Sequence, residues 1–502
     1  VDSLEAALAL LDRQSALFGT GDPLDMVEYR LALGQALQQA GRPAEALREL
    51  IATEREADRL GQRAARIQAL SGAAQVAGRL GDPERSLSYG RRALEVWESE
   101  RGLPEDPAWR EVRGAAAAEV VTGMGATLLE YPPDVPEAER ARIAFDAVQV
   151  LKSRTLMERI LGPTGAETPA LRLSPTSCAD LQETVLHPGE LLLDFYLGAE
   201  TSLLFAVSAE DCRAFRLPGA RELEPVLLPY LRMTSAPKDG GPAGAEFGED
   251  LTGVHRRLRE LLFGPALDCV RRGGRLILIP DCILHRLSFA ALLADSGTTG
   301  EGAVPVMQTV PSATILARLR ADSAHRTAGA GSGAILALAG AEDGRARPLG
   351  EAVREVRDLA RRFEGVIVSL PSSIEGANVA LSAPIRGAPP SDASADSALG
   401  GAPPAGFSAD STLLTALSPY GVLHLAAHAT VEEEHAWNSR VHLQGGRAGG
   451  RPLDLTASAI ARSRLPARLV VLSTCRSGVG RVLSGEGVQG LASAFLVAGV
   501  PA

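Results

Sequence analysis

The sequence contains few cysteines, and they are widely scattered. There are five in 502 residues, no two of them spaced as Cys-x-x-Cys: Cys178, Cys212, Cys269, Cys282 and Cys475. A disulfide framework or a structural zinc site requires clustered cysteines, so neither is indicated. We therefore expect a reducing, cytoplasmic environment, with no metal and no cofactor.

Long apolar runs and basic runs are also missing. No apolar stretch reaches the roughly 18 residues of a membrane-spanning helix, and the N-terminus lacks the basic, apolar, small-residue order of a signal peptide. The net charge is −10, and the basic residues are nearly all arginine and not clustered. This argues against a nucleic-acid or anionic-membrane partner. Because Val1 is not a start residue and Ala502 follows an apolar run, both ends look cut.

The composition is that of a soluble globular protein, with 45% hydrophobic and 22% charged residues. A chain of 502 residues is too long for one hydrophobic core. We predict a multidomain protein with helical repeats in residues 1–162. Two halves of an α/β domain follow in residues 163–330 and 331–502, and the second half looks truncated at its C-terminal end.

The first 162 residues are predicted to be helical throughout, because Ala, Leu, Glu, Arg and Gln dominate. One pattern recurs as Ala40-Gly-Arg-Pro-Ala-Glu-Ala-Leu47 and Leu80-Gly-Asp-Pro-Glu-Arg-Ser-Leu87, with Gly ending one helix and Pro opening the next. We predict tetratricopeptide-like helical hairpins, whose stacked surface would hold a peptide or a partner protein. A plain helical bundle is the alternative.

Strand and helix signals alternate after a linker at residues 164–177. A hairpin of buried strands is predicted at Glu190–Tyr196 and Thr201–Val207, another buried strand at Arg275–Asp281, and a helix at residues 255–269. Asp281, at the end of its strand, is interpreted as a turn cap.

The last third of the chain has the same alternation. Strands are predicted at residues 334–340, 366–370 and 421–429, with an amphipathic helix at residues 350–363. Residues 383–408, rich in Pro, Ala, Ser and Gly, are predicted to form a disordered surface loop. This order of elements is typical of a doubly wound, mostly parallel sheet.

Two apolar strands of this last third end in residues that can do chemistry. Gly421-Val-Leu-His-Leu-Ala-Ala-His428 ends at a histidine, and Leu469-Val-Val-Leu-Ser-Thr-Cys475, expected to be a fully buried parallel strand, ends at a cysteine. The intervening chain is long enough for a crossover helix and a return strand. If the strands are neighbours, His428 and Cys475 share one crevice. A cysteine beside a histidine there is a nucleophile beside its base.

Several motifs together carry a resemblance to a known family. They are His424-x-Ala426-x-His428, Leu472-Ser-Thr-Cys475 followed by Ser477-Gly478, and Gly485-Glu-Gly-Val488-x-Gly490-Leu-Ala-x-Ala-Phe495-Leu-x-Ala-Gly499. Earlier segments also match: Leu151-Lys-Ser-Arg154, Ile279-Pro-Asp281, Phe289-Ala-Ala-Leu292 and Pro311-Ser-Ala-Thr314. With the helical repeats before them, these motifs resemble the caspase-like CHAT peptidase family, from the clan of caspases and separase.

The resemblance implies a cysteine endopeptidase with a His428 and Cys475 dyad. Cys475 would attack the scissile carbonyl, His428 would transfer the proton, and the backbone N–H groups of Ala429 and Cys475 would hold the oxyanion. The family usually has glycine where Ala429 stands, so this hole requires an ordinary backbone conformation there. The resemblance also implies a dedicated protein substrate, gating through a partner or ligand of the helical repeats, and a role in bacterial defence or programmed cell death.

Substrate specificity is predicted from three carboxylates near the expected site. Glu342 and Asp343 follow the strand at residues 334–340, and Glu486 follows the cysteine loop. Three acidic candidates for the S1 pocket favour Arg or Lys as the P1 residue. Arg476, beside the nucleophile, favours an acidic P1 residue instead.

Other functions have weaker sequence support. His424 and His428 lack the HExxH helix of a metal site, so His424 is interpreted as a hydrogen-bonded core histidine. Gly329-x-Gly331-x-Gly333 precedes its strand and lacks the Gly-Lys-Ser/Thr ending of a phosphate loop. The serious alternative is a catalytically inactive scaffold whose repeats recruit a partner, and the intact Cys475 and His428 argue against it.

Overall fold

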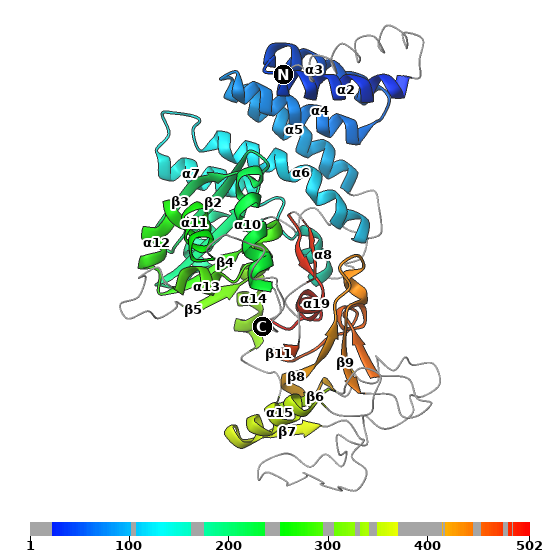
Figure 1. Ribbon diagram of the computed structural model, residues 1–502, viewed down its shortest axis with the longest axis vertical. Coiled ribbons are helices and arrows are strands. Elements are labelled where there is room, and N and C mark those ends of the chain that lie inside the picture. The colour runs from blue at the N-terminus through cyan, green and yellow to red at the C-terminus, as the bar shows by residue number, and fades with distance from the viewer. Residues whose placement is uncertain are drawn as a thin grey trace. The chain divides into compact units, whose positions relative to one another are not determined.

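The computed structural model divides the chain into two compact units. The first comprises Val1–Thr155, Ser174–Leu316 and Leu483–Gly487, and the second Leu156–Leu173, Ala317–Val482 and Val488–Ala502. Within them the structure describes residues 23–101, 107–161, 175–235, 251–294, 306–326, 332–340, 349–369, 414, 417–444, 453–474, 480–483 and 485–501 (Figure 1). None of the helices in these ranges combines the length and apolarity that crossing a membrane requires. The predicted three-part division stays a prediction.

The first unit begins with helices joined by tight turns, which confirms the helical N-terminal region. The helices are α2 (Pro23–Gln39), α3 (Pro43–Arg59), α4 (Arg63–Arg79), α5 (Pro83–Arg101), α6 (Pro107–Leu128) and α7 (Glu137–Val148), followed along the chain by α8 (Arg154–Leu161). Gly41, Gly61 and Gly81 have φ of 73°, 69° and 74° in the turns. This left-handed conformation favours glycine, so the repeated glycine ends each helix at the same place.

The helices pack closely because small residues face large ones. Leu50 is fully buried in α3. A Cβ atom added to Gly34 would lie 2.8 Å from the Leu50 side chain, and one added to Gly72 would lie 3.1 Å from it. The leucine therefore fills the space that two neighbouring helices leave at their glycines.

The first unit continues with a five-stranded sheet in the order β3-β2-β1-β4-β5. The strands are β1 (Glu190–Tyr196), β2 (Thr201–Val207), β3 (Cys212–Pro218), β4 (Arg275–Ile279) and β5 (Val306–Thr309). β1 pairs antiparallel with β2, and β2 with β3, whereas β4 runs parallel to β1 and to β5. The predicted hairpin of β1 and β2 is confirmed at its exact bounds, and β3 and β5 were not predicted.

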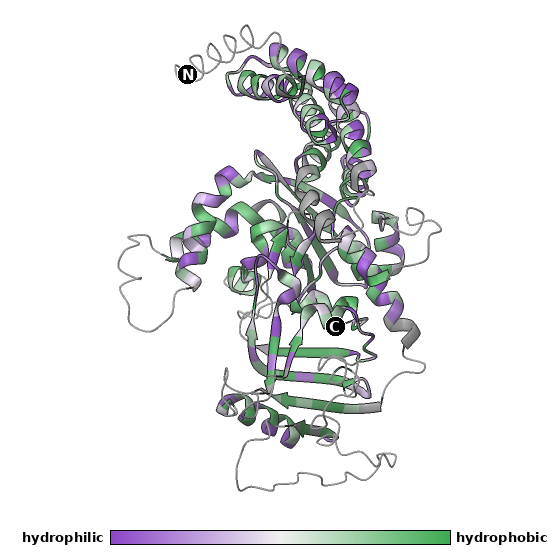
Figure 2. Cartoon of the chain, turned by 90° about the vertical axis from the view of Figure 1, so that its right-hand side faces the viewer, coloured by the Kyte–Doolittle hydropathy of each residue, from purple (hydrophilic) through white to green (hydrophobic). Residues whose placement is uncertain are grey.

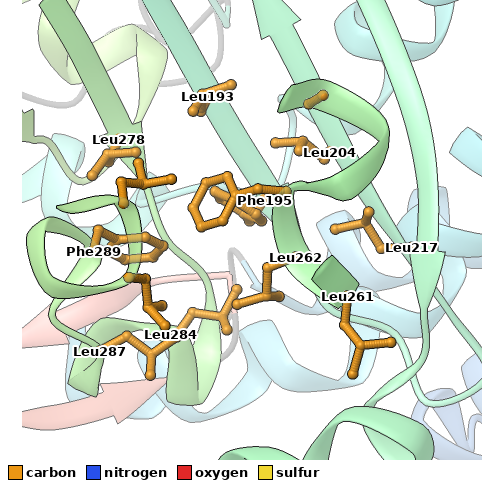
Figure 3. Close-up of a cluster of buried hydrophobic side chains, with 14 of the residues drawn as sticks. Leu193, Phe195, Leu204, Leu217, Leu261, Leu262, Leu278, Leu284, Leu287 and Phe289 are labelled. Atoms are coloured by element: carbon orange, nitrogen blue, oxygen red, sulfur yellow. The ribbon is translucent and has the colours of Figure 1, made fainter. Parts of the chain in front are cut away.

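One face of this sheet buries an apolar cluster under helices. Side chains of β1, β2, β3 and β4 meet those of α10 (Ala220–Ser235), α11 (Leu251–Phe263), α12 (Leu267–Arg272) and α13 (Phe289–Ala294). Figure 3 shows the part of this cluster between the strands, α11 and α13. Phe195 lies within it, 5.8 Å in ring centroid distance from both Phe263 and Phe289. The single helix expected at residues 255–269 was wrong, since α11 ends at Phe263 and a 3-10 turn at Gly264–Ala266 precedes α12. Pro265 lacks the N–H that a continuous helix needs.

A polar network is buried in the first unit. Lys152 Nζ lies 2.8 Å from Asp194 Oδ1, with side chains 2% and 0% exposed. Gln149 donates to the other carboxylate oxygen at 2.7 Å and to the Tyr196 hydroxyl at 3.0 Å. Burial raises the pKa of Asp194 above its ordinary value even though Lys152 opposes the shift. Asp281 caps the next turn by accepting from Cys282 N–H at 2.9 Å, which confirms its predicted role.

The second unit contains a six-stranded sheet. Its order is β10-β9-β8-β6-β7, and β11 pairs with β8. The strands are β6 (Ser332–Ala339), β7 (Val366–Ser369), β8 (Tyr420–Thr430), β9 (Arg440–Gln444), β10 (Leu453–Thr456) and β11 (Leu469–Thr474). The helices are α15 (Gly350–Arg362), α18 (Ala457–Ala461) and α19 (Leu491–Val497), while α14 (Ala313–Arg326) links the units along the chain, and β12 (Arg481–Leu483) pairs with β13 (Gly487–Gln489).

The sheets are mixed, so the expectation of a mostly parallel sheet is not confirmed. β8 runs parallel to β6 and β11, but antiparallel to β9, which pairs antiparallel with β10. In Figure 2 the strands have mainly the colour of hydrophobic residues, whereas hydrophobic and hydrophilic residues alternate along the helices. This matches buried strands covered by amphipathic helices. The disordered loop predicted at residues 383–408 lies outside the described residues.

The expectation of a fully buried cysteine strand was wrong for β11. Leu469 is 39% exposed and Val471 is 37% exposed. Within the described part of the chain, β8 is the strand that pairs with β11, so the other edge has no partner there. Apolar alternate residues of an edge strand stay accessible where no helix covers them.

Candidate active site

The strands that carry the predicted dyad are neighbours. β8 and β11 run parallel, with Val471 paired to His424, Ser473 to Ala426 and Thr474 to Ala427. His428 follows Ala427 directly, and Cys475 follows Thr474 directly. Cys475 itself lies outside the described residues. The register therefore brings the two strands side by side up to the last residue before each predicted catalytic group.

One face of this strand pair lies under α15. Side chains alternate along a strand, so His424, Ala426 and His428 share a face, and the register adds Ser473 to it. Ala426 packs on this face with Ala352, Val353 and Val356 of α15. The helix thus covers the sheet beside the strand ends, where His428 is half-buried.

A hollow of about 390 Å³ opens at these strand ends. It is lined by Leu349, Glu351, Ala352 and Glu355 from the start of α15, by Ala427 and His428 from β8, and by Leu472, Ser473 and Thr474 from β11. An imidazole and two carboxylates thus share one concave surface beside the residue that precedes Cys475. The hollow lies at the carboxyl ends of parallel strands, which is where proteins with such sheets place their sites.

The other predicted site residues are placed as follows. Ala429 is the next-to-last residue of β8 and has no positive φ, since the non-glycine residues with positive φ in the described ranges are Ser153 and Cys282. The backbone there is therefore ordinary, as the substitution of glycine by alanine requires. Glu342 and Asp343 lie outside the described residues.

Glu486 is buried at 1% exposure and is engaged within the first unit. Its carboxylate accepts from Thr155 N–H at 3.2 and 3.0 Å, and from Thr155 Oγ1 at 2.7 Å. A carboxylate held by three contacts anchors its segment to Thr155. Its assignment to the S1 pocket stays a prediction.

Glu355 was not foreseen. Its carboxylate lies 2.9 Å from His424 Nε2 and accepts from Ser473 Oγ at 2.9 Å. The first contact confirms that His424, 8% exposed, is a hydrogen-bonded core histidine. The amphipathic pattern predicted the helix, but nothing in the sequence indicated which strands its polar edge would touch.

A second imidazole faces His428 across the antiparallel pair of β8 and β9. His442 is the register partner of His428. Its Nδ1 lies 2.8 Å from Asp454 Oδ1, and its Nε2 lies 2.7 Å from Thr430 Oγ1. An acceptor carboxylate places a proton on Nδ1 and so orients the ring. In the part of the chain that the structure describes, no group of three or more His, Cys, Asp or Glu side chains is placed to hold a metal ion.

Gly340 allows the strands to come together below the hollow. A Cβ atom there would lie 2.4 Å from Ala427 Cβ and 2.6 Å from the His442 carbonyl oxygen. Neither neighbour is a flexible chain end, so a larger residue would displace β8 directly before His428. The glycine is required for close approach of backbone at the site.

The fold is thus an N-terminal helical region followed by an α/β region with mixed sheets, and the candidate site lies at the carboxyl ends of β8 and β11. The family model of the CHAT domain matches residues 252–502, which is half of the chain. The chain belongs to the CHAT domain family.

Comparison with solved structures finds similarity to the separase–securin complex of Saccharomyces cerevisiae. The TM-score is 0.45 and the sequence identity 8%, with 99% of this chain and 44% of that chain covered. The chain therefore spans less than half the length of that protein. A search of curated proteins found no match to the sequence.

Proposed function

We propose that this protein is a cysteine endopeptidase that cuts a dedicated protein substrate with a His428 and Cys475 dyad. The observation that carries the proposal is the parallel register of β8 and β11, which ends at Ala427 and Thr474, directly before the two residues. A thiol placed beside an imidazole at such an edge is deprotonated by it and attacks a carbonyl carbon. His428 then returns the proton to the leaving amine.

Membership of the CHAT family supports a caspase-like peptidase, and the hollow supports its specificity. Glu351 lines the hollow beside His428. A carboxylate on this surface favours an Arg or Lys side chain at P1, as do the predicted candidates Glu342 and Asp343. The role in bacterial defence or programmed cell death rests on the resemblance seen in the sequence.

The proposal is tested with irreversible peptidyl electrophiles that differ only at P1. We expect a probe with Arg or Lys at P1 to label Cys475 at least about tenfold faster than the same probe with Asp, because a charged hydrogen bond contributes roughly 1.5–3 kcal/mol. Mass spectrometry of the labelled peptides identifies the cysteine and gives the rates. Glu342→Gln, Asp343→Asn and Glu351→Gln then show which carboxylate carries the preference.

Cys178 and Cys269, both buried, are internal references in the same samples. If every probe labels Cys475 no faster than these two cysteines, the dyad is not functional. The protein is then better described as a scaffold whose helical repeats bind a partner.

We also propose that the helical region gates the site through the segment at residues 485–486. The segment lies in Leu483–Gly487, which belongs to the first unit, although Ala317–Val482 and Val488–Ala502 on either side along the chain belong to the second. Ser153 N–H donates to the Gly485 carbonyl oxygen at 2.6 Å, and Thr155 holds Glu486. Ser153 lies between α7 and α8, and Thr155 lies in the first turn of α8. A change in these helices, caused by a bound partner or ligand, would therefore reach the chain shortly after Cys475.

Thr155→Val tests the gate, because it removes the Oγ1 donor and keeps the shape. We expect the amide hydrogens of residues 485–490 to exchange at least about tenfold faster, since the lost bond reached a buried carboxylate. The rate of Cys475 labelling should change in the same variant. Hydrogen exchange read by mass spectrometry gives the first quantity.

Thr184→Val is the matched control, since Thr184 Oγ1 donates to the Asp180 carbonyl oxygen at an exposed position. It should leave both measurements unchanged. Faster exchange without any change in labelling would show that the contact is structural and does not gate the site.

A further inference from the structure

Glu355 joins the two strands that end at the candidate dyad. Its carboxylate reaches His424 on β8 and Ser473 on β11, each at 2.9 Å. The helix α15 that carries it packs on the same face of the sheet, through Ala352, Val353 and Val356. A single side chain of a rigid element therefore contacts both strands.

The two contacts lie close to the ends of the strands. Ser473 is two residues before Cys475, and His424 is four residues before His428, on the same strand face by the two-residue period. The register pairs His424 with Val471 and Ser473 with Ala426, so the two donors are diagonal neighbours across β8 and β11. Loss of either contact would therefore allow the strand residues that lead to His428 and Cys475 to shift.

The chemistry of the contacts is defined by the acceptor. An ionised carboxylate only accepts hydrogen bonds, so the proton of His424 lies on Nε2 and Ser473 donates its hydroxyl. Charged hydrogen bonds of this kind are shorter and stronger than neutral ones. The pair of bonds resists a slide of β11 along β8 and a rotation of either strand.

We propose that Glu355 is a positioning residue that holds the ends of β8 and β11 so that His428 and Cys475 meet in reactive geometry. This rests on the proposed peptidase function and adds a residue that no sequence motif indicated. Positioning matters because a displacement of about 1 Å at reacting groups costs on the order of a hundredfold in rate. Glu355 acts through His424 and Ser473 and does not touch the scissile bond.

Glu355→Gln tests the proposal, because the amide keeps the shape but replaces the charged acceptor by a neutral group with one acceptor oxygen, which weakens the contacts to the two partners. With a fluorogenic peptide bearing Arg at P1, we expect kcat to fall about tenfold to a hundredfold and KM to stay within about twofold. Alkylation of Cys475 by iodoacetamide, read by mass spectrometry, should slow by a similar factor. Ser473→Ala should lower kcat as well. The double variant should have a kcat no lower than that of Glu355→Gln alone, because both substitutions act on the same contact between Glu355 and Ser473.

Asp358→Asn is the matched control. Asp358 lies on α15 one turn beyond Glu355, where it accepts from the exposed Arg361. It should leave kcat, KM and the thermal midpoint unchanged. Glu355→Gln should also keep the wild-type midpoint, and a loss of activity that only follows unfolding would overturn the positioning role.

Two further results separate this proposal from the peptidase proposal. If wild-type Cys475 is alkylated no faster than in His428→Ala, no functional dyad exists and both proposals fall. If the alkylation depends on His428 but Glu355→Gln leaves kcat within about twofold of wild type, only the positioning role is wrong. A rise in KM with kcat unchanged would assign Glu355 to substrate binding instead.

Discussion

Replacing Cys475 with alanine is expected to abolish cleavage of an Arg-P1 peptide, and His428→Ala is expected to lower kcat by about 10²- to 10⁴-fold. The cysteine supplies the bond-forming atom, so nothing replaces it. The histidine contributes as a general base and acid, an effect of that size in other enzymes. Because the two act as one unit, the double variant should be no slower than Cys475→Ala.

The measurement is steady-state hydrolysis with the enzyme concentration set by active-site labelling. Cys269→Ala and His435→Ala are the controls, since Cys269 is buried in the first unit and His435 is exposed and does not line the hollow. Both should keep wild-type rates. Activity that survives in Cys475→Ala would assign the cleavage to a different nucleophile and would remove the central reason for the peptidase proposal.

The pairing of β8 with β11 could be predicted because its signals are local. Each strand is a short apolar run followed by small or polar residues, and the chain between them has the length of a crossover. The bounds of β1 and β2 were predicted for the same reason. Where local pattern and tertiary structure agree, the sequence is sufficient.

Glu355 could not be predicted because its partners are far away in sequence. It is 69 residues from His424 and 118 residues from Ser473. A helical period indicates the buried face of α15 but not which polar residue at its edge meets a strand. The same limit applies to His442, whose importance comes from its register opposite His428 on a strand too short to stand out.

Glu486 shows a different limit of sequence reasoning. It was assigned to the site because it follows the cysteine loop, yet its carboxylate is buried against Thr155, 331 residues earlier. Closeness in sequence gave a candidate for the pocket, whereas long-range packing gave the residue a partner at the end of the helical region. Charge alone does not tell a substrate contact from a structural one.

Lys152→Met is expected to destabilise the first unit strongly. The ammonium group lies 2.8 Å from Asp194 Oδ1, and 3.4 and 3.5 Å from the carbonyl oxygens of Ile279 and Pro280, and it also donates to the Phe195 carbonyl. It lies 4.3 Å from the Tyr196 ring centroid. Removing one member of a buried ion pair costs about 3–5 kcal/mol, because it leaves the other charge without compensation.

A lysine suits the buried position of residue 152 better than an arginine would. Lys152 and Lys238 are the lysines among 51 basic residues. A compact ammonium with three donors can point at a carboxylate and several carbonyls at once, whereas a planar guanidinium needs a wider, forked site. Lys152 therefore stands where an arginine would not fit the acceptors.

The loss in free energy of unfolding is measured from the hydrogen-exchange rates of the β1 amides, which report the opening of the first unit. Arg271→Met is the matched control, because Arg271 forms an exposed pair with Asp268 and should cost less than about 1 kcal/mol. Lys152→Met combined with Asp194→Asn should recover most of the loss, since neither member of the pair is then charged and Gln149 keeps an acceptor. A double variant as unstable as Lys152→Met would mean that the lysine contributes by packing.

The pH dependence gives an independent check. Burial already raises the pKa of Asp194, and Lys152 is the main influence that lowers it. Without the lysine the folded-state pKa rises further above the unfolded value, so the cost is greatest above the folded pKa and shrinks as the pH falls through it. Lys152→Met should therefore regain stability relative to wild type as the pH falls through this raised pKa. A deficit that stays constant as the pH is lowered would show that the Asp194 charge is not the source of the instability.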